Sequence, residues 1–141
     1  MQDDEPFPPI TPAEFDALAA SPAVAEARFV CARHGTEAGF VRLVGGYTRG
    51  WMVVVESFVC RQHQRIHERT AEALRDAIAR ADVWEIFVMD VEWAPFFCER
   101  CERVYCGDCW RTWEVFEDDF PHWVDQVRGA CPAGHERMLS D

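Results

Sequence analysis

The sequence has no long run of apolar residues, no excess of positive charge, and no internal repeat or low-complexity tract. Its longest uncharged apolar stretch is residues 51–55, whereas a membrane-spanning helix needs roughly 20 such residues. Lysine and arginine number 14 against 25 aspartates and glutamates, so the 141 residues carry a formal net charge of -11. This sign opposes binding to nucleic acid phosphates and to anionic membrane surfaces. We therefore expect neither a membrane nor a nucleic acid partner, and a protein partner with a basic surface suits the charge better.

Hydrophobic residues nevertheless make up 49% of the chain, which is enough to form a folded core. The chain starts Met-Gln-Asp-Asp-Glu-Pro, which is the opposite of the basic start of a secretory signal peptide. We therefore expect a cytoplasmic protein, in which thiols remain reduced. Seven cysteines then need a role other than disulfide bonds, and their odd number also argues against a closed disulfide framework.

Local patterns in the first half of the chain predict a short helix followed by a β-hairpin. Thr11 is a good N-cap for a helix over residues 12–20, because proline follows it directly and glutamate lies three residues after it. Residues 40–44 and 51–59 are rich in β-branched and aromatic side chains. They flank a glycine-containing turn at residues 45–50, which predicts the hairpin.

The second half of the chain predicts both helices and strands, so the expected fold class is α+β. Apolar residues at helical spacing predict an amphipathic helix over residues 68–83. Residues 85–93 and 113–116 favour strands because they are rich in β-branched and aromatic side chains. Residues 121–127 favour a short helix that is ended by Gly129.

All seven cysteines and three of the five histidines fall into five closely spaced pairs. These pairs are Cys31 with His34, Cys60 with His63, Cys98 with Cys101, Cys106 with Cys109, and Cys131 with His135. Two ligands so close in sequence lie on one tight turn and bind a single ion, and zinc prefers thiolates and imidazoles in tetrahedral sets of four. A second, distant pair completes each set and links two segments of the chain.

Several ways of combining the pairs are open. The first two pairs flank the predicted hairpin, as in a zinc ribbon, which predicts one site made of Cys31, His34, Cys60 and His63. The pair at Cys131 then joins either the pair at Cys98 or the pair at Cys106, or His67 and His122 add ligands for a third ion. A cross-brace, in which alternate pairs share an ion, also fits and would replace the ribbon pairing. We expect two or more structural zinc ions.

The block over residues 97–109 resembles the middle of cross-brace zinc domains. It contains Phe-Cys-Glu-Arg-Cys and Tyr-Cys-Gly-Asp-Cys, which are similar to B-box, in-between-RING and FYVE-like modules. The upstream Cys60 and His63 resemble the opening pair of a B-box. The resemblance covers about a third of the chain, and it departs from those families where 34 residues separate His63 from Cys98. It implies a scaffold of the type found in ubiquitin ligases.

The residue patterns favour a protein that is not an enzyme. Thiolate-rich zinc sites are usually structural, and the chain has neither the HExxH motif nor the zinc deaminase signature. A redox CxxC motif requires a thioredoxin-like context, which the sequence does not show. A thioester-forming cysteine must be free of metal, and none is free if all five pairs bind zinc. Acidic pairs such as Asp118 and Asp119 are not grouped with a nucleophile.

Large aromatic residues crowd the last third of the chain, which holds several of its six tryptophans and ten phenylalanines. They can fill the core of a thin zinc-stabilised layer, or they can form an exposed anchor for a partner protein. Trp110, Trp113 and Trp123 are the candidate partner-binding residues. Four acids at residues 114 and 117–119 form either a solvated face or a rim that attracts a basic partner.

Together the patterns predict four segments. These are an N-terminal arm with a short helix (1–27), a zinc ribbon (28–67), a helix and strand (68–93), and a C-terminal zinc-binding lobe (94–141). The predicted function is that of a non-enzymatic adaptor or regulator, which binds another protein through the aromatic and acidic C-terminal lobe. Three alternatives are open: a ubiquitin-ligase-like scaffold, a nucleic-acid-binding zinc ribbon, and an acidic inhibitor or immunity-type protein.

Overall fold

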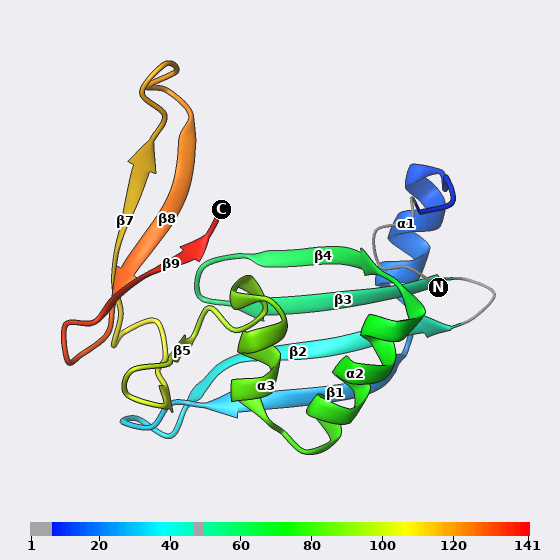
Figure 1. Cartoon of the computed structure of the whole chain (residues 1–141), viewed down its shortest axis with the longest axis horizontal. Helices are drawn as coiled ribbons and strands as arrows, with labels where there is room; N and C mark the ends of the chain where they lie inside the picture. The colour runs from blue at the N-terminus through cyan, green and yellow to red at the C-terminus, as the bar shows by residue number, and fades with distance from the viewer. Residues whose placement is uncertain (1–6, 47–49) are drawn as a thin grey trace.

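A computed structural model describes residues 7–46 and 50–141 and shows an α+β fold with three antiparallel sheets. The largest sheet has four strands in the order β1-β2-β3-β4 (Figure 1). The strands are β1 (Ala23–Val30), β2 (Glu37–Gly46), β3 (Gly50–Ser57) and β4 (Arg61–Ile66). Each strand pairs with the next one along the chain, so the sheet is a simple meander.

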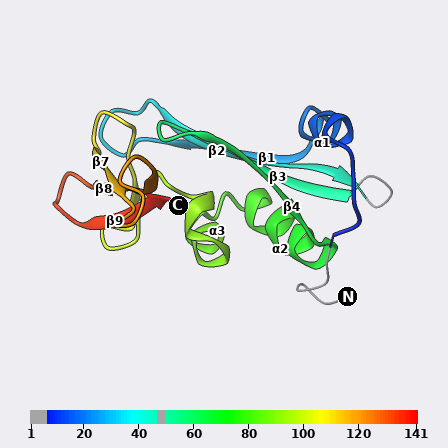
Figure 2. The ribbon, with the colours of Figure 1, turned by 90° about the horizontal axis from the view of Figure 1, so that it is seen from above.

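Two helices pack on one face of this sheet and one short helix packs on the other (Figure 2). Two helices, α2 (Glu68–Ala79) and α3 (Val83–Met89), lie on one face. The short helix α1 (Pro12–Ala19) lies on the opposite face, at one end of the sheet. The described residues contain no helix that is long and apolar enough to cross a membrane.

The main apolar core lies between the sheet and α2. Leu74 and Ile78 of α2 belong to one cluster with Leu43 and Val53 of the sheet, and all four are at most 3% exposed. On the opposite face, Leu18 of α1 packs into a smaller cluster with residues of β2 and β3. The same cluster continues into the C-terminal part of the chain through Phe96, Trp110 and Leu139, so burial of apolar surface also holds the two parts together.

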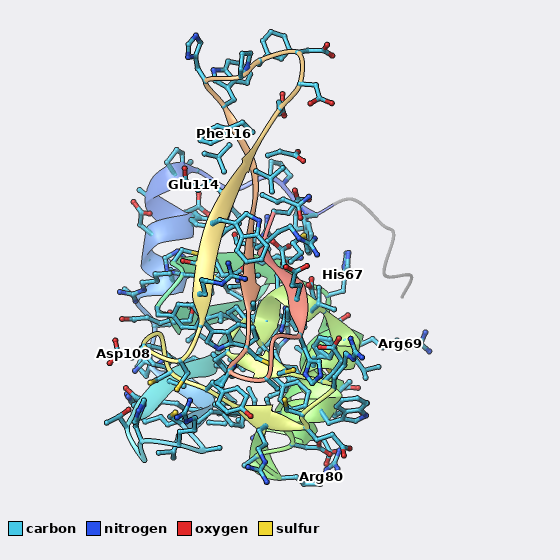
Figure 3. The ribbon with its side chains drawn as sticks, turned by 90° about the vertical axis from the view of Figure 1, so that its left-hand side faces the viewer. His67, Arg69, Arg80, Asp108, Glu114 and Phe116 are labelled. Carbon is cyan, nitrogen blue, oxygen red and sulfur yellow. The ribbon has the colours of Figure 1, made fainter. Side chains whose placement is uncertain are left out.

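The C-terminal part forms two small sheets beyond one end of the large sheet (Figure 1). A short 3-10 helix, η1 (Val91–Trp93), leads into a two-stranded sheet of β5 (Phe97–Cys98) and β6 (Arg103–Val104). A three-stranded sheet follows, in the order β7-β8-β9, with β7 (Arg111–Phe116), β8 (Val124–Ala130) and β9 (Glu136–Ser140). The hairpin of β7 and β8 projects away from the rest of the molecule (Figures 1 and 3).

Several local predictions are confirmed. The Thr11 side chain accepts a hydrogen bond from the Glu14 N–H, and the Glu14 side chain accepts one in return, so α1 begins at a capping box. The predicted hairpin is β2 and β3, although its tip at residues 47–49 lies outside the described residues, as does part of the predicted arm, residues 1–6. The predicted amphipathic helix is α2, and β7 contains the predicted strand at 113–116.

The predicted strand at residues 85–93 is wrong, because this segment forms α3 and η1. The Asp82 side chain accepts a hydrogen bond from the Glu85 N–H at 3.1 Å, which caps the start of α3. The helix also buries Ile86 completely. Capping and packing therefore outweigh the β preference of the aromatic and β-branched residues here.

The predicted short helix at residues 121–127 is also wrong, because β8 begins at Val124. Backbone hydrogen bonds from Trp123 to Phe120 and from Glu117 to Trp123 close a hairpin loop between β7 and β8. Gly129 therefore lies inside a strand and does not end a helix. A Cβ atom at this position would come within 2.6 Å of the buried Leu139 side chain, so close packing explains the glycine.

Candidate metal centres

Two clusters of cysteine and histidine side chains each bring four ligand atoms within 4.8 Å of one another. The first cluster is Cys31, His34, Cys106 and Cys109, and the second cluster is Cys98, Cys101, Cys131 and His135. These are eight of the ten residues that the sequence predicts as ligands. Each cluster presents three sulfurs and one imidazole, so each can hold one metal ion.

Tight turns position the ligands of the first cluster. Cys31 and His34 follow β1, where the Gly35 N–H donates a hydrogen bond to the Cys31 carbonyl at 2.9 Å. Gly35 has a φ of +70°, a conformation that glycine adopts without strain. Cys106 and Cys109 precede β7, and the Cys109 N–H donates to the Cys106 carbonyl at 2.9 Å. Both turns therefore direct two side chains toward the same point.

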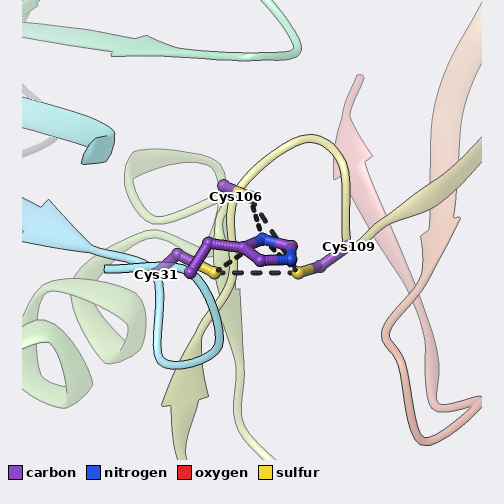
Figure 4. A group of neighbouring side chains, drawn as sticks. Cys31, Cys106 and Cys109 are labelled. Carbon is purple, nitrogen blue, oxygen red and sulfur yellow. Dashed lines mark hydrogen bonds between the residues drawn. The ribbon is translucent and has the colours of Figure 1, made fainter. Parts of the chain in front are cut away.

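In the first cluster, three sulfur atoms surround a histidine ring (Figure 4). The Cys109 sulfur lies 3.7 Å from that of Cys31 and 3.9 Å from that of Cys106. Nδ1 of His34 lies 3.2 Å from the Cys106 sulfur and 3.5 Å from the Cys109 sulfur. Cys31 and Cys106 are buried but His34 is exposed, so the first cluster reaches solvent through its histidine.

The second cluster repeats this geometry with ligands from the β5–β6 and β8–β9 turns. Nδ1 of His135 lies 3.3 Å from the Cys101 sulfur, 3.5 Å from that of Cys131 and 3.6 Å from that of Cys98. The Cys101 and Cys131 sulfurs are 3.7 Å apart. His135 is half-buried, so the second cluster is better shielded than the first.

The thiols in each cluster are too close together to ionise independently. Burial and the neighbouring Cys31 and Cys106 raise the pKa of Cys109 to about 12, and burial raises the pKa of Cys98 to about 11. Burial would also raise the pKa of Cys31, but backbone N–H groups near its sulfur, including that of Arg33 at 3.4 Å, lower it below the ordinary value. A bound cation would stabilise all the thiolates together.

The two clusters are interleaved along the chain. The first cluster joins the turn after β1 to the turn before β7, and the second joins the β5–β6 turn to the β8–β9 turn. Of the four contributing pairs, the first therefore shares a cluster with the third, and the second shares one with the fourth. This is the cross-brace alternative, and the second cluster is one of the C-terminal partitions that the sequence left open.

The predicted ribbon site does not form, because Cys60 and His63 lie outside both clusters. Strand β2 lies between β1 and β3 in the sheet, so about 10 Å of sheet separates Cys31 from the β3–β4 connection. Cys60 is exposed in that connection. The His63 ring instead packs edge-on against Phe15 of α1, with ring centroids 6.3 Å apart.

The two histidines considered for a third ion, His67 and His122, also lie outside both clusters. His67 precedes α2, and its ring stacks on Phe7 with centroids 4.3 Å apart. His122 is exposed in the loop between β7 and β8. Within residues 7–46 and 50–141, the Cys and His side chains therefore provide for two ions and not three.

The three predicted partner-binding tryptophans have different environments. Trp110 is 6% exposed and its Nε1 donates to the Tyr105 carbonyl at 3.1 Å, so it is a core residue and its predicted partner contact is wrong. Trp113 is half-buried, and the Arg111 guanidinium lies over its ring. Trp123 is 64% exposed near the tip of the β7–β8 hairpin.

Sequence reasoning missed Arg137, which is buried two residues after a ligand of the second cluster. Its guanidinium donates to the backbone carbonyls of Val91, Ala94 and Phe97 at 2.7–2.8 Å. Burial lowers its pKa to about 10, so it remains charged at neutral pH. An isolated arginine in a short strand gives no pattern from which this role could be read.

A family model described as "Domain of unknown function (DUF8328)" matches the chain over residues 21–141. The matched region contains all eight side chains of the two clusters and the whole β7–β8 hairpin. No curated protein and no solved structure matches the chain.

Proposed function

The chain belongs to the DUF8328 family, and we propose that it is a zinc-stabilised, non-enzymatic module that binds another protein through its β7–β8 hairpin. The single observation that carries this proposal is the hairpin itself. It projects from a base that the two clusters fix, and it exposes aromatic side chains that no neighbouring element of the described chain covers.

The spacing of the ligand atoms supports zinc as the metal. A tetrahedral zinc ion lies about 2.3 Å from sulfur and about 2.0–2.1 Å from nitrogen, which places sulfurs about 3.8 Å apart and sulfur and nitrogen about 3.6 Å apart. Three of the six sulfur–sulfur distances in the two clusters are 3.7–3.9 Å, and all ligand atoms of a cluster lie within 4.8 Å of one another. Their sulfur–nitrogen distances are 3.2–3.9 Å. Three thiols and one imidazole also form a donor set that binds zinc in preference to harder cations such as magnesium or calcium.

The number of ligands supports a structural role for both ions. Catalytic zinc sites keep one coordination position for water, whereas each cluster here supplies four protein ligands. When bound, the ions would link chain segments and would leave no position for a substrate. The four protein ligands in each cluster therefore support a structural role for the metal and a non-enzymatic function for the protein.

The tip of the hairpin supports a role in protein binding. Phe116, Phe120, Trp123 and Val124 are 45–64% exposed, and the rings of Phe120 and Trp123 stack with centroids 5.0 Å apart. Clustered exposed aromatic residues of this kind are typical of binding hot spots. Acidic residues surround them at positions 114, 117–119 and 125, so the proposed partner has a basic surface.

The proposal is tested with the zinc-loaded full chain and a double substitution, Phe120→Ser with Trp123→Ser. The matched control is Trp84→Ser, which removes a 45%-exposed tryptophan on α3. We expect the double variant to bind two zinc ions. The amount of each partner protein that it captures should be about tenfold or more below the amount that the native chain captures. Equal capture by the native chain and the double variant would exclude the hairpin as the binding element.

A second candidate, a scaffold similar to those of ubiquitin ligases, is favoured by one observation. The interleaved use of Cys and His pairs is the linkage found in the cross-brace domains that residues 97–109 resemble. This candidate requires binding to a ubiquitin-conjugating enzyme. A titration against a panel of such enzymes distinguishes it, because a partner-binding module without this role binds none of them.

A further inference from the structure

We infer that a cleft at the base of the β7–β8 hairpin, together with the apolar face above it, binds an extended basic segment of the partner protein. This inference rests on the proposed function and specifies the kind of partner. The cleft has a volume of about 370 Å³. Its walls are the β3–β4 connection and the hairpin, and they consist of Phe58, Val59, Thr112, Trp113, Glu114 and Val127.

The wall on the β3–β4 side is held in a fixed position. Phe58 stacks on the buried Trp110, with ring centroids 6.3 Å apart. It also lies against Gly107, where an added Cβ atom would come within 2.7 Å of the Phe58 Cβ. Because Gly107 lies between Cys106 and Cys109, the turn that supplies the first cluster also supports the cleft. The cleft is therefore part of the rigid base of the hairpin.

Above the cleft, an exposed face of the hairpin continues to its tip, and this face is apolar except for Thr112 and Glu114. Glu114 pairs across the sheet with Val127, and Phe116 pairs with Val124. Side chains alternate along a strand, so residues 112, 114 and 116 lie on the same side of β7. Figure 3 shows Glu114 and Phe116 on this side. Phe116 and Val124 are 48% and 45% exposed, so the face can still bury apolar side chains of a partner.

The backbone of β7 borders the cleft and favours an extended ligand. Three consecutive residues, 112–114, line the cleft, so the cleft runs along this strand. Strand β7 is at one edge of the β7-β8-β9 sheet, and no other described strand pairs with its outer side. An edge strand can pair with an added strand, and alternate side chains of that strand would point into the cleft.

Charge decides the composition of the ligand. Residues 112–127 contain five aspartates and glutamates and no lysine or arginine. The two flanking arginines lie on the other side of the strands from Glu114, since Arg111 lies over the Trp113 ring and Arg128 pairs across the sheet with Trp113. An extended segment with apolar side chains at alternate positions and arginine or lysine between them matches the cleft, the edge strand and the acidic surroundings.

The test uses the zinc-loaded full chain and a synthetic peptide of alternating arginine and valine, Arg-Val-Arg-Val-Arg-Val-Arg. A peptide with the same composition in two blocks controls for charge alone, and one with glutamate in place of arginine controls for its sign. We expect the alternating peptide to bind most tightly and to slow amide hydrogen exchange in residues 111–116. Glu114→Arg should weaken its binding about tenfold, whereas Glu72→Arg on the exposed side of α2 should not.

Three results would overturn the inference. These are no binding of the alternating peptide, equal binding of the block peptide, and protection of amides elsewhere but not in β7. Each is distinguishable from failure of the proposed function. If the tip substitutions abolish capture of partners while the peptide does not protect β7, the hairpin binds proteins by another route. If the peptide protects β7 while the tip substitutions change nothing, the edge strand and not the tip is the binding element.

Discussion

At the residue scale, the guanidinium of Arg137 joins β9 to the segment that precedes the second cluster. It donates to four backbone carbonyls, of Val91, Ala94, Phe97 and Met138, and lies over the Phe87 ring at 5.0 Å. These hydrogen bonds all go to carbonyls, so backbone dipoles stabilise this buried charge, and the nearby carboxylates of Glu99 and Glu92 also favour it. Such a charge fixes one arrangement of the chain, because its acceptors must stay in place.

Replacing Arg137 should therefore cost more stability than replacing an exposed arginine. Arg137→Met keeps much of the side-chain volume but leaves four carbonyls without this donor, which is expected to lower the free energy of unfolding by about 3 kcal/mol. Arg69→Met on α2, where the side chain points into solvent (Figure 3), should change it by less than about 0.5 kcal/mol. Urea unfolding of both variants with excess zinc measures the difference. Equal effects would show that the carbonyl contacts do not stabilise the fold.

At the element scale, the turns that carry Cys and His pairs were predictable, but their partners were not. Close spacing of Cys and His residues is a local property, so the sequence located all four turns that the clusters use, together with a fifth pair, Cys60 and His63, that joins neither cluster. Which turns meet depends on strand order. Because β2 separates β1 from β3, the pair at Cys60 cannot reach the pair at Cys31, although both flank the predicted hairpin.

The same distinction applies to secondary structure. The helix at α1 was predictable because its signals, the capping box and proline, are local. The helix at α3 was missed although Asp82, with Glu85 three residues later, is also a local start signal. The β preference of its apolar residues obscured this signal, and the burial of Ile86 that favours the helix depends on tertiary packing. Strand β8 was missed for a similar reason, because pairing with β7 and β9 determines its conformation.

This pairing of turns predicts which substitutions release metal. Cys106→Ser should reduce the zinc content from two ions to one, since a tetrahedral site loses one of four ligands. Cys60→Ser is the matched control, because Cys60 also belongs to a CxxH or CxxC pair but lies outside both clusters, and it should leave two ions. Native mass spectrometry counts the ions in each variant. Loss of an ion from Cys60→Ser with retention in Cys106→Ser would instead support the ribbon pairing.

At the scale of the whole molecule, the two halves of the chain depend on metal to different degrees. The four-stranded sheet and α2 share an apolar core in which Leu43, Val53 and Leu74 are at most 1% exposed. The β7-β8-β9 sheet buries far less, chiefly Ala130, Leu139 and Arg137. Small elements without a sufficient apolar core rely on bound metal for their fold. The ions would also link this sheet to β1 and to the β5–β6 turn.

Removing zinc should consequently unfold the C-terminal sheets before the large sheet. With a chelator, we expect amide protection to fall first in residues 111–140 and to persist in β2 and β3, because neither these two strands nor α2, which packs on them, contains a ligand of either cluster. Because His34 is exposed, the first cluster is more accessible to the chelator. The ion in the first cluster should therefore leave faster than the ion in the second cluster. Hydrogen exchange read by mass spectrometry follows the loss of protection, and native mass spectrometry follows the loss of each ion. Simultaneous loss of protection in β2, β3 and the C-terminal strands would show instead that both halves fold as one metal-dependent unit. The β7–β8 hairpin could then not unfold while the large sheet stays folded.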